Sequence, residues 1–127
     1  MTDRKLIELA VEAMEKSYSP YSRVRVGAAI ECSDGTAFIG CNIENIAIGA
    51  TICAEKAAIA SAVSAGHRSF RRIAIVAESG SYRFPCGACR QLLIEFSTDL
   101  EVLSARGDGR YVSYPLSTLL PMPFGGD

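Results

Sequence analysis

Apolar residues near the start of the chain recur at the spacing of one helix face. They stand at Leu6, Leu9, Ala10, Ala13 and Met14. Thr2 precedes them as an N-cap, and Pro20 follows in a segment that favours a turn. We therefore expect a helix over residues 3–17.

The next segment changes to the alternation that is typical of a strand. Val24, Val26, Ala28 and Ile30 alternate with Arg25, Gly27, Ala29 and Glu31. Ser33-Asp34-Gly35 then favours a turn, so we expect residues 36–41 to return as the hairpin partner.

The rest of the chain alternates between helical and extended patterns. After a loop over residues 42–51, we expect a helix over 53–65 that Gly66 ends. Residues 73–77 are apolar throughout, as in a central strand covered on both faces. The remaining expected elements are a helix over 87–96 opened by Pro85, short strands over 101–105 and 111–114, and a helical turn over 116–120. This order predicts one layered α/β domain with a mixed sheet, spanning residues 1–127.

Composition and charge narrow the function classes. The chain has 127 residues, 49% of them hydrophobic, and a net charge of −1, so it can bury a core and is not disordered. Its densest basic cluster, around Arg68 and Arg72, lacks interleaved aromatics and is interpreted as a solvated turn. No apolar run reaches the ~20 residues of a membrane span, and no signal peptide is recognisable. We expect a cytoplasmic protein with neither nucleic acid nor membrane as its main partner.

Two short cysteine motifs carry the chemistry. Cys53 opens one expected helix, and Cys86 and Cys89, three residues apart, open another with both sulfurs on one side. The positive ends of both helices would stabilise thiolates. Three thiolates bind zinc and leave a fourth position open for water. Such a site has a net charge of −1, for which Lys56 and Arg90 are the candidate neutralising cations.

Glu55 is the candidate proton carrier beside this metal. Residues two apart on a regular helix do not face the same way, so the arrangement requires Cys53 to lie at the helix tip. Two other interpretations stay open: a redox Cys-x-x-Cys pair, and a closed structural zinc site. The fourth ligand of a closed site would come from Cys32, Cys41 or His67, although the two cysteines fit buried strand positions and the histidine fits the surface.

Taken together, these motifs resemble the small, tetrameric cytidine deaminases. The likeness covers nearly the whole chain and rests on five ordered segments: Tyr18 to Ser22, Val26 to Ala29, Gly40 to Asn45, Thr51 to Glu55 and Pro85 to Gln91. The resemblance implies a three-layer α/β/α fold with a five-stranded mixed sheet. It implies one Zn²⁺ on Cys53, Cys86 and Cys89, with Glu55 as proton shuttle. It also implies a homotetramer whose pockets borrow residues from neighbouring subunits.

The resemblance assigns substrate contacts as well. Asn42 and Glu44 would hold the sugar hydroxyls, since alternate residues leaving a strand face the same side. The backbone of Ala54 would orient the edge of the pyrimidine ring. A simpler interpretation of Asn42 and Glu44, as turn-forming polar residues, stays open.

The base-binding wall departs from the family pattern. Val24 stands where the family usually carries a Phe that stacks on the pyrimidine, and Ala47-Ile48 replaces a usual Ser-Tyr. Lys56 replaces a common Arg, while Phe124 can serve as the family's C-terminal aromatic cap. Up to two aromatic contacts, each worth about 0.5–1.5 kcal/mol, are therefore missing from the wall.

These observations predict zinc-dependent hydrolysis of cytidine and 2′-deoxycytidine to the uridine nucleosides and ammonia, in pyrimidine salvage. The alternative is a deaminase of modified cytosine nucleosides such as blasticidin S, which the Val24 and Ile48 replacements and the segment 58–66 favour. A non-catalytic zinc-binding assembly domain is the alternative of another class. A nucleic-acid editing deaminase fits less well, because the chain lacks a basic and aromatic groove.

Overall fold

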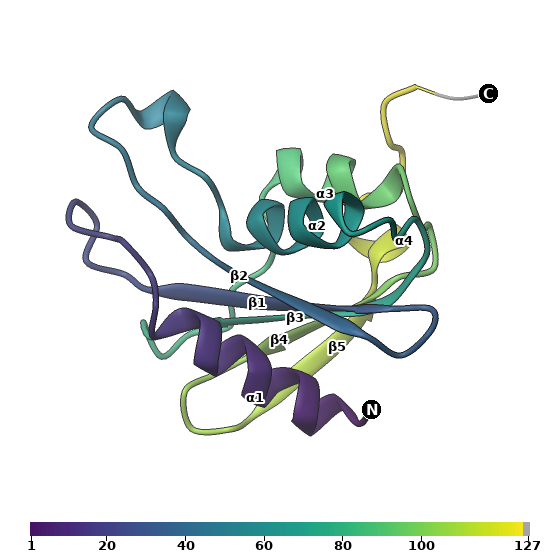
Figure 1. Ribbon diagram of the computed structural model, residues 1–127, viewed down its shortest axis with the longest axis horizontal. Coiled ribbons are helices and arrows are strands. Elements are labelled where there is room, and N and C mark those ends of the chain that lie inside the picture. The colour runs from purple at the N-terminus through teal and green to yellow at the C-terminus, as the bar shows by residue number, and fades with distance from the viewer. Residues whose placement is uncertain (126–127) are drawn as a thin grey trace.

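The computed structural model describes residues 1–125, which form one sheet covered by helices on both faces (Figure 1). The chain runs α1 (Asp3–Met14), β1 (Val26–Cys32), β2 (Ala37–Cys41), the 3₁₀ helix η1 (Ile48–Ala50), α2 (Ala54–Ser64), β3 (Phe70–Ala77), α3 (Gly87–Ile94), β4 (Glu101–Ala105), β5 (Tyr111–Pro115) and α4 (Leu116–Leu119). None of the helices described is long and apolar enough to cross a membrane.

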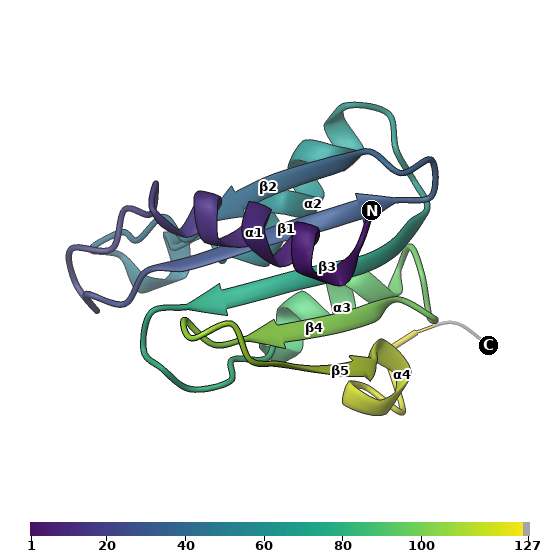
Figure 2. The same ribbon diagram turned by 90° about the horizontal axis from the view of Figure 1, so that it is seen from below.

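The five strands form a mixed sheet in the order β2-β1-β3-β4-β5 (Figure 2). β3 and β4 are parallel, and the other neighbouring pairs are antiparallel. Helix α1 covers one face, while α2, α3 and α4 lie on the other, which gives three layers (Figure 1). The expected α/β/α architecture with a five-stranded mixed sheet is therefore confirmed.

Two glycines let the helices approach the sheet closely. A Cβ on Gly27 would lie 2.0 Å from the carbonyl oxygen of Ala10, so α1 rests directly on β1. A Cβ on Gly40 would lie 2.3 Å from the amide nitrogen of Ala58 and 2.6 Å from the carbonyl oxygen of Ala54. The backbone of α2, which begins at the cysteine motif, is thus placed by its contact with β2.

The core divides between the two faces of the sheet. The central strand β3 is buried from Ile73 to Ala77, as its continuous apolar pattern predicts. At the α1 face, the fully buried carboxylate of Glu31 accepts a hydrogen bond from Nε of Arg72 at 2.6 Å. Arg72 also pairs with Asp3, so this ion network ties the start of α1 to β1 and β3.

Most expected elements are present, with shifted ends. Thr2 caps α1 by accepting a hydrogen bond from the amide of Lys5 at 3.1 Å, but the helix ends at Met14 rather than at 17. The strand expected from residue 24 begins at Val26, because the Asn42 side chain binds the backbone there. The 3₁₀ turn η1 lies in a segment that the sequence predicts only as loop.

Candidate active site

Three cysteine sulfurs converge between α2 and α3. The ligand atoms of Cys53, Cys86 and Cys89 all lie within 4.8 Å of one another. Cys53 and Cys86 are the extended N-cap residues of α2 and α3, and Cys89 lies in the first turn of α3. The carbonyls of Cys53 and Cys86 accept the first helical hydrogen bonds of their helices, at 3.0 and 2.9 Å. Both helix N-termini therefore meet at the sulfurs.

This donor set suits zinc. Soft thiolates select zinc among the common divalent ions, and three of them leave room for one further ligand. Within the described residues, no fourth His, Cys, Asp or Glu belongs to this cluster. Cys41 lies elsewhere, with its thiol 3.5 Å from the carbonyl oxygen of Lys16, and Cys32 and His67 belong to a second cluster with Asp34.

The thiols experience opposing influences. Burial raises the pKa of Cys53 and of Cys89. At Cys86 burial acts in the same direction, but hydrogen bonds from the backbone amides of Cys89 and Ala88 lower its pKa overall. The open helix N-terminus is thus already able to stabilise one thiolate, and a divalent cation would favour all three.

Glu55 lies beside the sulfurs and is 6% exposed. Because the backbone of Cys53 is extended and outside the helix, the two side chains line one cavity despite their spacing of two residues. Burial raises the pKa of Glu55, and the nearby charge of Arg83 opposes that rise. A carboxyl group with a raised pKa in a cleft is suited to carry a proton near neutral pH.

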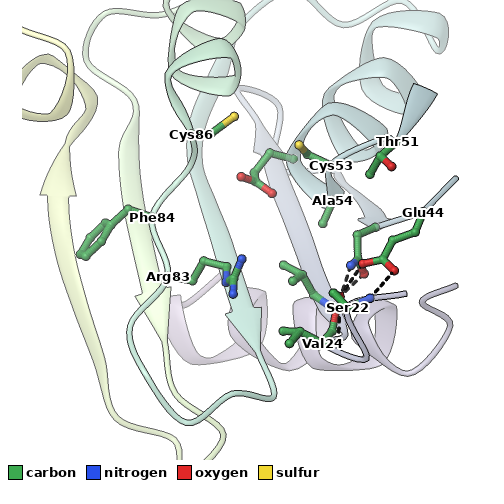
Figure 3. A pocket seen from close by; sticks show the side chains of 12 residues that line it. Ser22, Val24, Glu44, Thr51, Cys53, Ala54, Arg83, Phe84 and Cys86 are labelled. Atoms are coloured by element: carbon green, nitrogen blue, oxygen red, sulfur yellow. Dashed lines mark hydrogen bonds between the residues drawn. The ribbon is translucent and has the colours of Figure 1, made fainter. Parts of the chain in front are cut away.

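The cavity has a volume of about 290 Å³ and opens from the sulfurs toward the end of β2. Figure 3 shows the sulfurs of Cys53 and Cys86 at one end and the hydrogen-bonded Ser22 and Glu44 at the other. The lining residues that the sequence also proposes are Val24, Asn42, Glu44, Cys53, Ala54, Glu55 and Cys86.

Asn42 and Glu44 are held by local hydrogen bonds. The Oδ1 of Asn42 accepts from the amide of Val26 at 3.0 Å, and its Nδ2 donates to the carbonyl of Val24 at 3.0 Å. Glu44 accepts from the amides of Tyr21 and Ser22, each at 3.0 Å, and from the hydroxyl of Ser22. These hydrogen bonds lower the pKa of Glu44, and the bond from the Ser22 hydroxyl has the largest effect. The carboxylate therefore stays ionised at the cavity mouth.

Two expected substrate contacts do not line this cavity within one chain. Ile48 is 88% exposed and borders a neighbouring hollow with Tyr21. Phe124 is 89% exposed, and its backbone exchanges hydrogen bonds of 3.0 and 3.1 Å with the side chain of Gln91. Both residues are therefore exposed on the surface of the single chain.

The two candidate cations differ in their surroundings. Arg90 donates from Nε to the carbonyl of Pro85 at 2.6 Å and from Nη1 to the carbonyl of Leu119 at 2.7 Å. Its guanidinium therefore fixes the loop that carries Cys86. Lys56 is partly exposed on the first turn of α2. A role in neutralising thiolate charge stays a prediction for each.

Arg83 and Phe84 also line the cavity, and the sequence reasoning missed both. Figure 3 shows the Arg83 side chain reaching into the cavity. The Phe84 ring instead packs against Tyr114, with the ring centroids 5.8 Å apart. Their position directly before Pro85-Cys86 could have indicated this, because the residues that precede a metal-binding cysteine border the same cavity.

Comparison with known proteins agrees with this geometry. The family model described as "Cytidine and deoxycytidylate deaminase zinc-binding region" matches residues 1–104. The chain belongs to this deaminase family. A three-cysteine cluster in a zinc-binding family identifies Zn²⁺ as the cofactor.

Relatives match over most of their length. A cytidine deaminase of Sporosarcina psychrophila is 46% identical, over 85% of this chain and 82% of that protein. The crystal structure of cytidine deaminase from Burkholderia pseudomallei superposes with a TM-score of 0.94 at 45% identity, covering 98% of this chain and all of that one. A blasticidin-S deaminase of Bacillus cereus is 32% identical, over 96% of this chain and 91% of that protein.

Proposed function

We propose that this protein hydrolyses cytidine and 2′-deoxycytidine to uridine and 2′-deoxyuridine with release of ammonia, as a single-domain enzyme of cytoplasmic pyrimidine salvage. The observation that supports this most strongly is one cavity that reaches the three-cysteine cluster and buried Glu55 at one end and ionised Glu44 at the other. A nucleoside has the same two ends, a base to be attacked and a sugar to be held.

The chemistry follows from the position of Glu55. Cys53, Cys86 and Cys89 would hold zinc, whose Lewis acidity would lower the pKa of water to ~7. Glu55 would accept one proton from the attacking water and pass it to the ring N3. It would then carry the second proton, from the oxygen added at C4, to the amino group that departs as ammonia when the C4–N bond breaks. Water and cytidine thus give uridine and ammonia, and a proton carrier of this kind contributes about 10²–10⁴-fold in rate.

The sugar is bound at the opposite end. Glu44 offers carboxylate lone pairs to ribose hydroxyls. The side chain of Asn42 is held by the backbone of Val24 and Val26, and its second amide N–H is left to donate to the sugar. The backbone of Ala54, at the start of α2, lines the cavity between sugar and metal and orients the pyrimidine edge.

The active unit is a homotetramer. Among the described residues, four large apolar ones are 81–89% exposed on the isolated chain, namely Ile46, Ile48, Met122 and Phe124. Two of them lie in the loop around η1 and two near the C-terminal end, and exposed apolar groups that gather in this way indicate interaction surfaces. In the assembly, Ile48 and Phe124 close pockets at subunit boundaries, and Lys56 and Arg90 offset the charge of the thiolates.

A deaminase of modified cytosine nucleosides is the second candidate. Val24 lines the cavity, the ring of the neighbouring Phe84 packs against Tyr114, and a blasticidin-S deaminase is among the relatives. Val24→Phe restores a stacking ring, which is worth about 0.5–1.5 kcal/mol and so raises kcat/KM for cytidine by about 2–10-fold. The second candidate predicts that native kcat/KM for blasticidin S exceeds that for cytidine.

The direct test is incubation of the zinc-loaded protein with cytidine. Loss of cytidine absorbance and enzymatic measurement of ammonia should report equal amounts of product. If the zinc-loaded protein turns over neither cytidine nor 2′-deoxycytidine, the first proposal is wrong. If blasticidin S is not turned over either, the non-catalytic assembly domain remains.

A further inference from the structure

A second cluster of metal-ligating side chains lies away from the cavity. Ligand atoms of Cys32, Asp34 and His67 all lie within 4.8 Å of one another. They come from the end of β1, the turn that follows it, and the segment after α2. We propose that these three residues bind a second zinc ion, with water completing the coordination.

The fold directs each ligand toward this point. Cys32 shares a sheet face with Ala28 and Ile30, the face that α2 covers, and is fully buried there. The chain leaves α2 through Gly66, whose φ of +103° turns it back over the sheet. His67 follows, and its amide donates to the carbonyl of Ala62 at 3.0 Å in a regular helix-ending motif.

The side chains of the two polar ligands are oriented by neighbours, as metal ligands commonly are. The Oδ1 of Asp34 accepts from the amide and hydroxyl of Thr36 at 3.0 and 2.6 Å, which leaves Oδ2 directed at His67, 3.9 Å from its Nδ1. The His67 ring packs against Phe38 with the centroids 5.3 Å apart. The side chain of His67 is only 24% exposed, so its expected surface placement is only partly correct.

Charge and ligand type favour zinc. One thiolate, one carboxylate and a neutral imidazole balance the +2 charge, and mixed S, N and O donors suit zinc and its borderline neighbours cobalt and nickel. The negative end of the α2 dipole, adjacent to His67, also favours a cation.

This site would hold the end of α2 that lies opposite the catalytic cysteine. The 11 residues of α2 span about 16 Å, with Cys53 at one end and His67 just beyond the other. Metal binding at Cys32, Asp34 and His67 clips that far end to the β1–β2 turn. None of the three residues lines the catalytic cavity, so the inference is independent of the proposed activity.

The test uses protein that already carries one zinc per chain, titrated with Co²⁺. We expect a second equivalent to bind with a thiolate-to-cobalt absorption band and to raise the melting temperature. Asp34→Asn and His67→Asn should each weaken this binding by more than about tenfold, because even indirect partners of ligands contribute about 10–100-fold. Asp99→Asn, another exposed carboxylate, is the matched control and should bind like the native protein.

Two results would overturn the assignment. One is the absence of a second equivalent in the native protein at excess Co²⁺. The other is a second equivalent that persists in both Asp34→Asn and His67→Asn, which would place the ion at other groups. Cytidine turnover at saturating zinc should be unchanged in both variants.

Discussion

The contact between Gly40 and helix α2 offers a sharp test of how the fold positions the chemistry. Gly40→Ala places a methyl group 2.3 Å from the amide nitrogen of Ala58 and 2.6 Å from the carbonyl oxygen of Ala54. Ordinary contacts begin near 3.4 Å, so α2 must recede by about 1 Å. The obstacle is helix backbone, which cannot move aside as a flexible side chain would.

The expected cost has two parts. Overpacking of this kind destabilises a protein by about 1–3 kcal/mol. In addition, the shifted helix carries Cys53 and Glu55 away from the cysteines of α3, and a 1 Å misplacement of reacting groups costs on the order of 10²-fold in rate. We therefore expect Gly40→Ala to lower kcat for cytidine by about 10²-fold in the fraction that remains folded.

Urea unfolding and steady-state kinetics at saturating zinc measure these two effects separately. Gly107→Ala is the matched control, because a Cβ at Gly107 meets nothing within 4 Å. Native-like stability and kcat in Gly40→Ala would show that α2 is not placed by this contact and would refute the reasoning.

Two further predictions concern charged groups. Arg72→Met leaves the buried Glu31 carboxylate without its ion pair and should lower the free energy of unfolding at pH 7, measured in urea, by about 3–5 kcal/mol. The same change at the exposed neighbour, Arg71→Met, should alter this free energy little. Equal effects of the two substitutions would contradict the ion-pair argument. Ser22→Ala removes the hydroxyl that contributes most to the lowered pKa of Glu44. The pKa of Glu44 then rises, so the carboxylate becomes protonated at a higher pH. The acid limb of the plot of kcat/KM for cytidine against pH should therefore move to higher pH. An acid limb that does not move would show that Glu44 does not bind the substrate.

Local signals in the sequence were sufficient for most elements. Thr2 caps α1, Gly66 ends α2 with a positive φ, and the apolar run of β3 is the buried centre of the sheet. The convergence of Cys53 and the α3 cysteines was predictable because each motif sits at a helix N-terminus. These features depend on short-range geometry, which a single sequence contains.

The features that were missed depend on contacts between distant segments. The start of β1 moves from residue 24 to Val26 because Asn42, 16 and 18 residues further along the chain, binds the backbone there, which no local pattern indicates. Arg83 enters the cavity because the segment before α3 passes across it. Ile48 and Phe124 are exposed on the single chain, so their predicted contact with substrate depends on the proposed homotetramer.

The central claim is that Glu55 moves protons beside a zinc ion that three cysteines hold. The most direct measurement is zinc content and cytidine turnover of Glu55→Gln, side by side with the native protein. The account predicts unchanged zinc content at the three-cysteine cluster, because the amide replaces no ligand, and a fall in kcat of about 10²–10⁴-fold. Native-like turnover in the zinc-loaded variant would contradict it.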